Sequence, residues 1–252
     1  MCKELFMSFR SSALIATFAA LSSMAVMAGE DIAGVSLGAS LAQAKQAVTT
    51  ANEDYIISPL LGEGMREVGV KAVTEVHMPG LGLSDDGGPS DEFLALTDKS
   101  EKIWFASRVQ RLPDGERINK QTLEAALVEK FGKPSTIVPL SGTHYFWMYD
   151  RSGKQYFGNT PQGPCPGIMG NGNTTGFNGM TIRYPHQFRA ECGKRIEAHF
   201  SGMDANMISM YKLSITDYKA MYDQITGEEA QAKAAQEQQL SDEKAKDNKP
   251  KL

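Results

Sequence analysis

The 252-residue chain has few of the side chains and motifs on which common enzyme classes depend. It contains 4 histidines and 3 cysteines, and it has no Cys-x-x-C, Gly-x-Ser-x-Gly or His-Glu-x-x-His segment. These absences disfavour thioredoxin-type redox chemistry, a hydrolase nucleophile elbow and a zinc-protease site, respectively. The four histidines, at positions 77, 144, 186 and 199, stand outside recognisable catalytic motifs, so we expect packing or surface roles for them. We therefore expect no catalytic, cofactor-binding or metal-binding residue.

Positive charge is not in excess, and long apolar runs are missing beyond the N-terminal region. The 26 Lys and Arg residues are outnumbered by 30 Asp and Glu residues, which gives a net charge of -4. Nucleic-acid binding needs clustered cations to neutralise phosphates. Later apolar runs are broken by charge or glycine well short of the roughly 20 residues that cross a bilayer. We expect no nucleic-acid partner and no integral membrane segment in the mature protein.

The N-terminal residues have the pattern of a secretory signal peptide. Lys3 and Arg10 make the start positive, an apolar run follows, and residues 26–28 supply the small side chains that signal peptidase reads. We therefore expect residues 1–28 to be removed, so that the mature chain begins at Gly29 and works in the periplasm or outside the cell. The missing cysteine at the cleavage point argues against a lipid anchor.

Two cysteines remain after this removal, Cys165 and Cys192. In an oxidising compartment an isolated pair forms a disulfide more readily than a metal site. We predict a Cys165–Cys192 bridge, with two unpaired buried thiols as the alternative. The bridge would tie a Gly- and Asn-rich loop, predicted over residues 158–179, to the segment that enters a strand at residues 195–200.

Hydrophobic periodicity predicts a first unit of helix and sheet over residues 29–117. Ser40 and Gln43 form a capping box for a helix over residues 41–50. Period-two alternation then predicts strands, and a Gly- and Pro-rich loop interrupts them. The strands are expected at 67–78, 92–97 and 102–111, and the loop at 79–91.

A second unit over residues 118–226 has a similar order. Asn119 caps a helix that ends at Gly132. Strands are expected at 143–149, 154–157, 195–200 and 207–215, followed by a helix that ends at Gly227. The resulting fold class is α+β, an antiparallel sheet with helices packed on one face, and two divergent copies of one unit are one interpretation.

The C-terminal residues 227–252 are rich in Ala, Gln, Glu, Lys and Asp and carry too few apolar side chains to join a core. Their helix propensity is high, but an unpacked helix is marginal in water. We expect a fraying helix or a disordered tail. A solvated extension and a partner-docking helix are both compatible with this segment.

Aromatic side chains alternate along the strand predicted over residues 143–149. Tyr145, Trp147 and Tyr149 project to one face, and Phe146 and Met148 project to the other. Either both faces are packed, or one face presents its aromatic rings to a partner. Tyr145, Trp147 and Tyr149 are therefore candidate partner-binding residues.

Four acidic residues gather in and beside the loop over residues 79–91, at Asp85, Asp86, Asp91 and Glu92. Oxygen ligands at this density are typical of calcium sites. The spacing differs from that of an EF-hand, and a solvated hairpin tip explains the same residues. The sequence leaves both explanations open.

Two segments resemble the SmpA/OmlA (BamE-like) domain of the outer-membrane assembly machinery. Residues 38–40, Gly-Ala-Ser, stand where that family has Gly-Met-Ser or Gly-Met-Thr before a helix. Residues 131–134 and 146–149 are similar to its helix end and its strand aromatics. The β-lactamase inhibitory proteins are similar in fold and repeat the unit twice. The resemblance implies helices on an antiparallel sheet used to bind proteins, although the family's lipid-attaching cysteine is missing here and the chain is much longer.

These observations favour a periplasmic module that binds another envelope or secreted protein and catalyses nothing. One alternative is an inhibitor or immunity protein that blocks a secreted or periplasmic enzyme with the loops at 79–91 and 158–179. The other is an envelope hydrolase without familiar motifs. A histidine and a carboxylate clustered in a deep pocket would favour the hydrolase.

Overall fold

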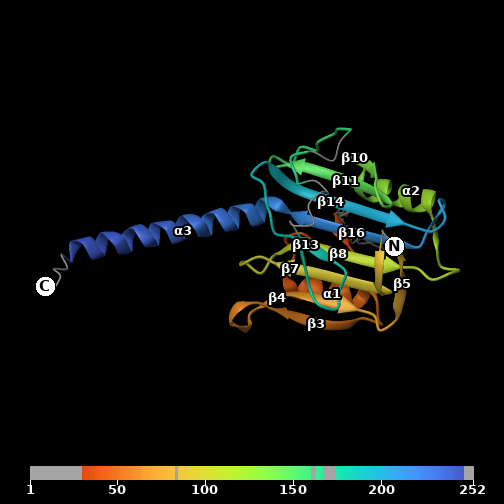
Figure 1. The fold of residues 1–252 in the computed structure, drawn as a ribbon, viewed down its shortest axis with the longest axis horizontal. Coiled ribbons are helices and arrows are strands. Elements are labelled where there is room, and N and C mark those ends of the chain that lie inside the picture. The colour runs from red at the N-terminus through yellow and green to blue at the C-terminus, as the bar shows by residue number, and fades with distance from the viewer. Residues whose placement is uncertain (1–29, 83–84, 160–162, 167–173, 247–252) are drawn as a thin grey trace, which may run out of the picture.

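The structure, a computed structural model, describes residues 30–82, 85–159, 163–166 and 174–246 (Figure 1). In this part of the chain the strands build one large antiparallel sheet of eight strands, in the order β10-β11-β14-β16-β8-β7-β4-β3, together with smaller two-stranded pairings. The predicted α+β class with an antiparallel sheet is confirmed. The predicted signal peptide lies outside the described residues.

The first half of the chain supplies one helix and then four consecutive strands of the large sheet. A short hairpin of β1 (Asp31–Ile32) and β2 (Val35–Ser36) precedes the helix, α1 (Leu41–Ala51). The four sheet strands are β3 (Ile56–Leu61), β4 (Glu67–Val73), β7 (Asp91–Thr97) and β8 (Ile103–Arg111). A 3-10 turn (Glu63–Met65) follows β3, and a hairpin of β5 (His77–Gly82) and β6 (Asp85–Pro89) separates β4 from β7.

The second half repeats this order. After β9 (Ile118–Asn119) come the helix α2 (Lys120–Phe131) and the sheet strands β10 (Thr136–Pro139), β11 (Thr143–Asp150), β14 (Cys192–Ser201) and β16 (Met210–Asp217). The short strands are β12 (Thr174–Gly176), β13 (Arg183–Pro185) and β15 (Met207–Ile208), and α3 (Tyr218–Ala245) closes the described chain. Because β8 and β16 pair at the centre, the two halves form one continuous sheet. The element order agrees with two copies of one unit, and the boundary between residues 117 and 118 stays a prediction.

Both predicted helix starts are formed by the local chemistry that the sequence indicates. The Ser40 side chain accepts from the Gln43 backbone N–H, and the Gln43 side chain accepts from the Ser40 backbone N–H. The Asn119 carboxamide caps the N–H groups of Gln121 and Thr122. Gly132, with a positive φ of 75°, ends α2 by donating its N–H to the Val128 carbonyl. Each helix then packs an apolar stripe against the same face of the sheet.

The predicted strand over residues 67–78 is wrong in its length. The chain leaves the large sheet at Thr74, whose hydroxyl bonds the Ser90 hydroxyl and the Asp91 backbone. The expected loop at 79–91 is instead the β5–β6 hairpin. Gly87 and Gly88, both with positive φ, lie within β6 opposite Pro79 and Met78, and a Cβ at Gly87 would collide with the backbone of β5.

The two edge strands of the large sheet, β3 and β10, were not predicted from the alternation pattern. Each contains a proline, Pro59 in β3 and Pro139 in β10. Proline cannot donate to a strand ladder and is therefore confined to edges, so its presence argues against a central strand while remaining compatible with an edge. The expected strand at 154–157 is absent from the described structure, which shows only an isolated bridge between Tyr149 and Gln155.

The prediction that the last helix ends at Gly227 is also wrong. α3 continues through Gly227 to Ala245, and Figure 1 shows it extending away from the sheet. A glycine inside a helix costs about 1 kcal/mol relative to alanine, and the strong helix formers on both sides offset that cost. The described part of the tail is thus helical. No helix in the described chain combines the length and apolar character needed to span a bilayer.

The large sheet buries apolar side chains on both faces. The helix face, covered by α1 and α2, carries Phe93, Trp147 and Ile196. The opposite side, which we call the loop face, is covered by the β12–β13 segment and by the disulfide-linked segment around Cys165. Side chains on the two faces alternate along each strand, as the strand pleat requires.

Candidate functional site

A row of polar side chains crosses the loop face of the sheet. The strand register places His144 opposite His199, and His199 opposite Lys212. Two further residues of β14 lie on the same face because alternate residues of a strand point to the same side. We call these five residues the polar cluster: His144, Arg195, Glu197, His199 and Lys212.

Glu197 connects the members of the polar cluster. Its carboxylate lies 3.2 Å from His144 Nδ1 and accepts from Arg195 Nη2 at 2.7 Å. Burial alone would raise the pKa of Glu197, but the charge of Arg195, assisted by His144 and Lys212, outweighs burial and holds this pKa far below its usual value. Glu197 is therefore a carboxylate that stays ionised within a largely covered site.

The two histidines of the cluster stack in parallel, with ring centroids 4.0 Å apart. His144 uses both nitrogens, Nδ1 toward Glu197 and Nε2 toward the Leu140 carbonyl at 3.1 Å. His199 Nε2 lies 2.9 Å from the Ser141 carbonyl, which requires the proton on that nitrogen. Burial and the neighbouring His144 lower the pKa of His199 to about 4. His199 is therefore neutral at pH 7.

The two remaining members of the polar cluster, Arg195 and Lys212, have different surroundings. Arg195 donates to the backbone carbonyl of Pro166, and its guanidinium lies over the rings of Phe146 and Tyr218. Burial lowers the pKa of Lys212, and attraction to Glu197 opposes this effect. Arg195 thus links the polar cluster to the segment that carries the disulfide.

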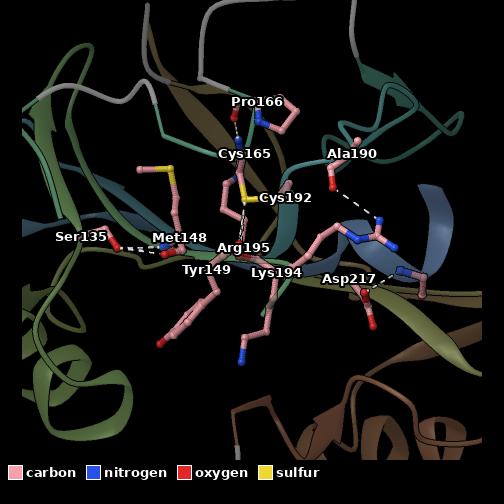
Figure 2. Close-up of a disulfide and its surroundings, with 12 residues drawn as sticks. Ser135, Met148, Tyr149, Cys165, Pro166, Ala190, Cys192, Lys194, Arg195 and Asp217 are labelled. Atoms are coloured by element: carbon pink, nitrogen blue, oxygen red, sulfur yellow. Dashed lines mark hydrogen bonds between the residues drawn. A yellow bond between two sulfur atoms is a disulfide. The ribbon is translucent and has the colours of Figure 1, made fainter. Parts of the chain in front are cut away.

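The predicted disulfide is present, and Figure 2 shows it beside Arg195 of the polar cluster. Cys165 and Cys192 have a Cα–Cα distance of 4.6 Å, and both are fully buried. The bridge packs with Phe146, Met148 and Tyr218. It therefore clamps the segment at residues 163–166 onto strands β11 and β14.

The predicted partner-binding aromatics lie on the helix face. Trp147 is 0% exposed, its Nε1 donates to the Gly132 carbonyl at 2.9 Å, and its ring lies 5.3 Å from that of Phe131. Tyr145 is buried beside it. Tyr145 and Trp147 are therefore core residues beneath α2. This corrects the interpretation that their rings are presented to a partner, and it agrees with the alternative that both faces of the strand are packed. Tyr149 is half-buried under Lys194, and a partner role for it stays a prediction.

The acidic residues near the β5–β6 hairpin divide between the two faces. Asp91 is on the helix face and pairs with Arg108 at 2.5 Å, whereas Glu92 is on the loop face and pairs with Arg111 at 2.9 Å. These two carboxylates cannot ligate one calcium ion together. The side chain of Asp85 lies outside the described structure, and within that structure no three metal-ligating side chains come together.

Two segments that are distant in the sequence meet at the Glu92–Arg111 pair. The Thr181 backbone N–H donates to Glu92 Oε2 at 2.7 Å, and Arg111 Nη2 donates to the Thr181 hydroxyl at 2.7 Å. Arg111 Nη1 also donates to the Pro89 carbonyl at 2.8 Å. The end of the β5–β6 hairpin and the β12–β13 segment are therefore fastened to the same buried ion pair.

Ion pairs and hydrogen bonds engage His144, Arg195, Glu197 and His199 of the polar cluster. Nucleophilic catalysis needs a base with a nitrogen free to accept a proton from a nearby hydroxyl or thiol. Both His144 nitrogens are engaged, and within the described structure no serine, threonine or cysteine side chain bonds either stacked ring. The sequence could not reveal this cluster, because its members come from three strands that only the pairing register unites.

Acidification should destabilise the fold through His199. The unfolded chain protonates this histidine near its ordinary pKa of about 6.5, whereas the folded chain protonates it near 4. The unfolded state therefore binds more protons in this window, and the free energy of unfolding falls by about 2–3 kcal/mol as the pH drops from 7 to 4. Denaturant titrations across this range measure the fall.

The matched variants for this prediction are His199→Gln and His77→Gln. The glutamine at 199 can still donate to the Ser141 carbonyl but does not titrate, so it should flatten the pH dependence between 6.5 and 4. His77 is exposed, and its replacement should leave the profile unchanged. An identical slope in wild type and His199→Gln would show that another group is responsible.

Comparisons of the chain with protein-family models, curated proteins and solved structures find no match. The resemblance to the SmpA/OmlA domain and the β-lactamase inhibitory proteins therefore stays an expectation. The functional argument rests on the geometry of the sheet and its loops.

Proposed function

We propose that this chain is an exported, non-catalytic protein that binds another protein of the cell envelope. The signal-peptide pattern and the buried Cys165–Cys192 bridge support delivery to an oxidising compartment such as the periplasm. The engaged nitrogens of His144 support a role without catalysis.

The single observation that carries this proposal is the convergence of two loops on the loop face. Thr181 and Pro89 are held by the same Glu92–Arg111 pair, so the end of the β5–β6 hairpin and the β12–β13 segment are held next to each other. Loops held by a rigid sheet are the usual place for recognition. Beneath them, Trp104, Tyr184 and Phe188 pack edge to face, which keeps the β12–β13 segment in a defined position.

Inhibition of a secreted or periplasmic enzyme is the second candidate. The same convergence favours inhibition. The β5–β6 hairpin overlaps the loop predicted at 79–91, and β12 lies at the end of the loop predicted at 158–179. These are the two loops expected to block an enzyme. For an envelope hydrolase, the His144–Glu197 pair is the only supporting feature within the described chain, and its hydrogen bonds leave no free base on His144.

Site-specific photo-crosslinking in living cells tests the proposal. A photoreactive residue at Asp86 or Asn178, both exposed on the converging loops, should crosslink to an envelope protein. The control is the same residue at Glu129, which is exposed on α2 on the helix face. We expect adducts from the two loop positions and none from Glu129.

The outcomes of this experiment separate the candidates. An adduct with an envelope protein without enzymatic activity supports the binding module, and an adduct with a secreted enzyme whose activity falls on addition of purified protein supports the inhibitor. Protein found untrimmed in the cytosol, or adducts at Glu129 alone, would contradict both.

A further inference from the structure

A cavity of about 470 Å³ lies on the helix face, between the β1–β2 turn, helix α1 and strand β8. Its volume falls within the range of small-molecule sites, and it is a hollow open to solvent, because Gln43, Gln46 and Thr50 in its lining are exposed. Ala33, Ala47 and Ala51 contribute methyl groups, and Gln43 and Gln46 contribute carboxamides. The one charged residue in the described lining is Arg108, which comes from the centre of the sheet.

Arg108 is held rigidly by a buried partner. Its Nε and Nη2 donate to the two oxygens of Asp91 at 3.0 and 2.5 Å. Asp91 also accepts from the Tyr55 hydroxyl at 2.5 Å and from the side-chain amides of Asn52 and Gln110, each at 3.1 Å. This network orients the guanidinium before any ligand arrives, which reduces the entropy lost on binding.

The Arg108 guanidinium retains donors that Asp91 does not use. An arginine has five N–H groups in a planar fork, and Asp91 occupies two of them. Within the described structure Nη1 has no hydrogen-bond partner, and 18% of the Arg108 side chain remains exposed. The edge formed by Nη1 and the remaining N–H of Nη2 matches the geometry of a carboxylate.

We infer that this cavity binds a carboxylate attached to a short aliphatic group. The fork supplies paired donors for one carboxylate, and the three alanine methyl groups form an apolar wall beside it. A dianionic phosphate fits less well, because the nearby Asp91 already balances the charge of Arg108. The ligand is either a free small acid or the C-terminal carboxylate of a peptide, which present the same chemistry to Arg108.

Titration by NMR with N-acetylleucine and with its uncharged amide tests the inference. The acid should shift the Arg108 Nε and Gly34 backbone resonances with a dissociation constant on the order of 1 mM, and the amide should bind at least roughly 10-fold more weakly. A free and an amidated tripeptide ending in leucine form the second arm. Tighter binding of the free tripeptide than of N-acetylleucine identifies a chain end as the ligand, and equal or weaker binding identifies a small acid.

Two variants localise the effect. Arg108→Lys retains a positive charge for Asp91 but lacks the fork, so the affinity for N-acetylleucine should fall roughly 10-fold or more. Ala51→Met narrows the cavity without altering the Arg108–Asp91 pair, so it should lower the affinity for N-acetylleucine to a similar extent. This variant keeps the test possible if Arg108→Lys is too unstable to measure. Arg66→Lys, at an exposed arginine outside the cavity, is the control. Equal shifts from acid and amide, or no shift at about 50 mM, would overturn the inference whatever the outcome of the crosslinking.

Discussion

Replacing Trp147 by alanine will lower the free energy of unfolding by about 3–5 kcal/mol. The indole is fully buried beneath α2, and its loss creates a cavity next to Phe131 and Tyr145. The same substitution leaves the Gly132 carbonyl at the end of α2 without its donor. Denaturant unfolding monitored by circular dichroism measures the change.

Phe157→Ala is the matched control, because it removes an aromatic ring of the same region that is 53% exposed. Among the ring contacts of the described residues, the Phe157 ring has one, with Lys133. We therefore expect Phe157→Ala to change the free energy of unfolding by no more than about 0.5 kcal/mol. Equal, small effects of the two substitutions would instead mean that Trp147 is at the surface, and would restore it as a partner-binding residue.

Removal of the disulfide is expected to have the second large effect. The double variant Cys165→Ala with Cys192→Ala should lose about 3–4 kcal/mol of stability, because the bridge closes a loop across a sequence separation of 27 and restricts the unfolded chain. In the folded chain, the segment at residues 163–166 would retain the Arg195 contact to Pro166 but lose its covalent link to β14. Hydrogen exchange at the backbone N–H groups of Gly163 and of residue 165 should become faster, since Pro164 and Pro166 carry no N–H.

Chemical reduction of the wild-type protein provides the comparison for the double variant. If the bridge acts mainly through the unfolded chain, reduced wild type and the alanine variant should have the same unfolding midpoint in denaturant. If reduced wild type or the alanine variant unfolded at the same denaturant midpoint as oxidised wild type, the bridge would contribute nothing to stability. Free thiols in protein isolated from cells would, in addition, contradict the proposed oxidising compartment.

The parts of the fold that depend on neighbouring residues were predictable. The capping box of Ser40 and Gln43, the Asn119 cap and the Gly132 stop each act within one or two turns of helix, so the order of residues is sufficient to identify them. The disulfide was also predictable, since the predicted mature chain offers one possible pairing. The misplaced helix end at Gly227 shows the limit of this reasoning, because a single glycine is a weak signal against the surrounding helix formers.

The sites that join residues distant in the sequence were decided by the tertiary structure alone. His144, Glu197 and Lys212 form one cluster because three strands align in a particular register, and Arg108 opens onto a cavity because α1 and the β1–β2 turn stop beside it. A period-two pattern states that side chains alternate between two faces, but it does not state which strands are neighbours or at which residues they pair. The sequence by itself therefore determined the helix caps, the fold class and the disulfide, and strand pairing across the centre of the sheet determined where charge and cavity lie.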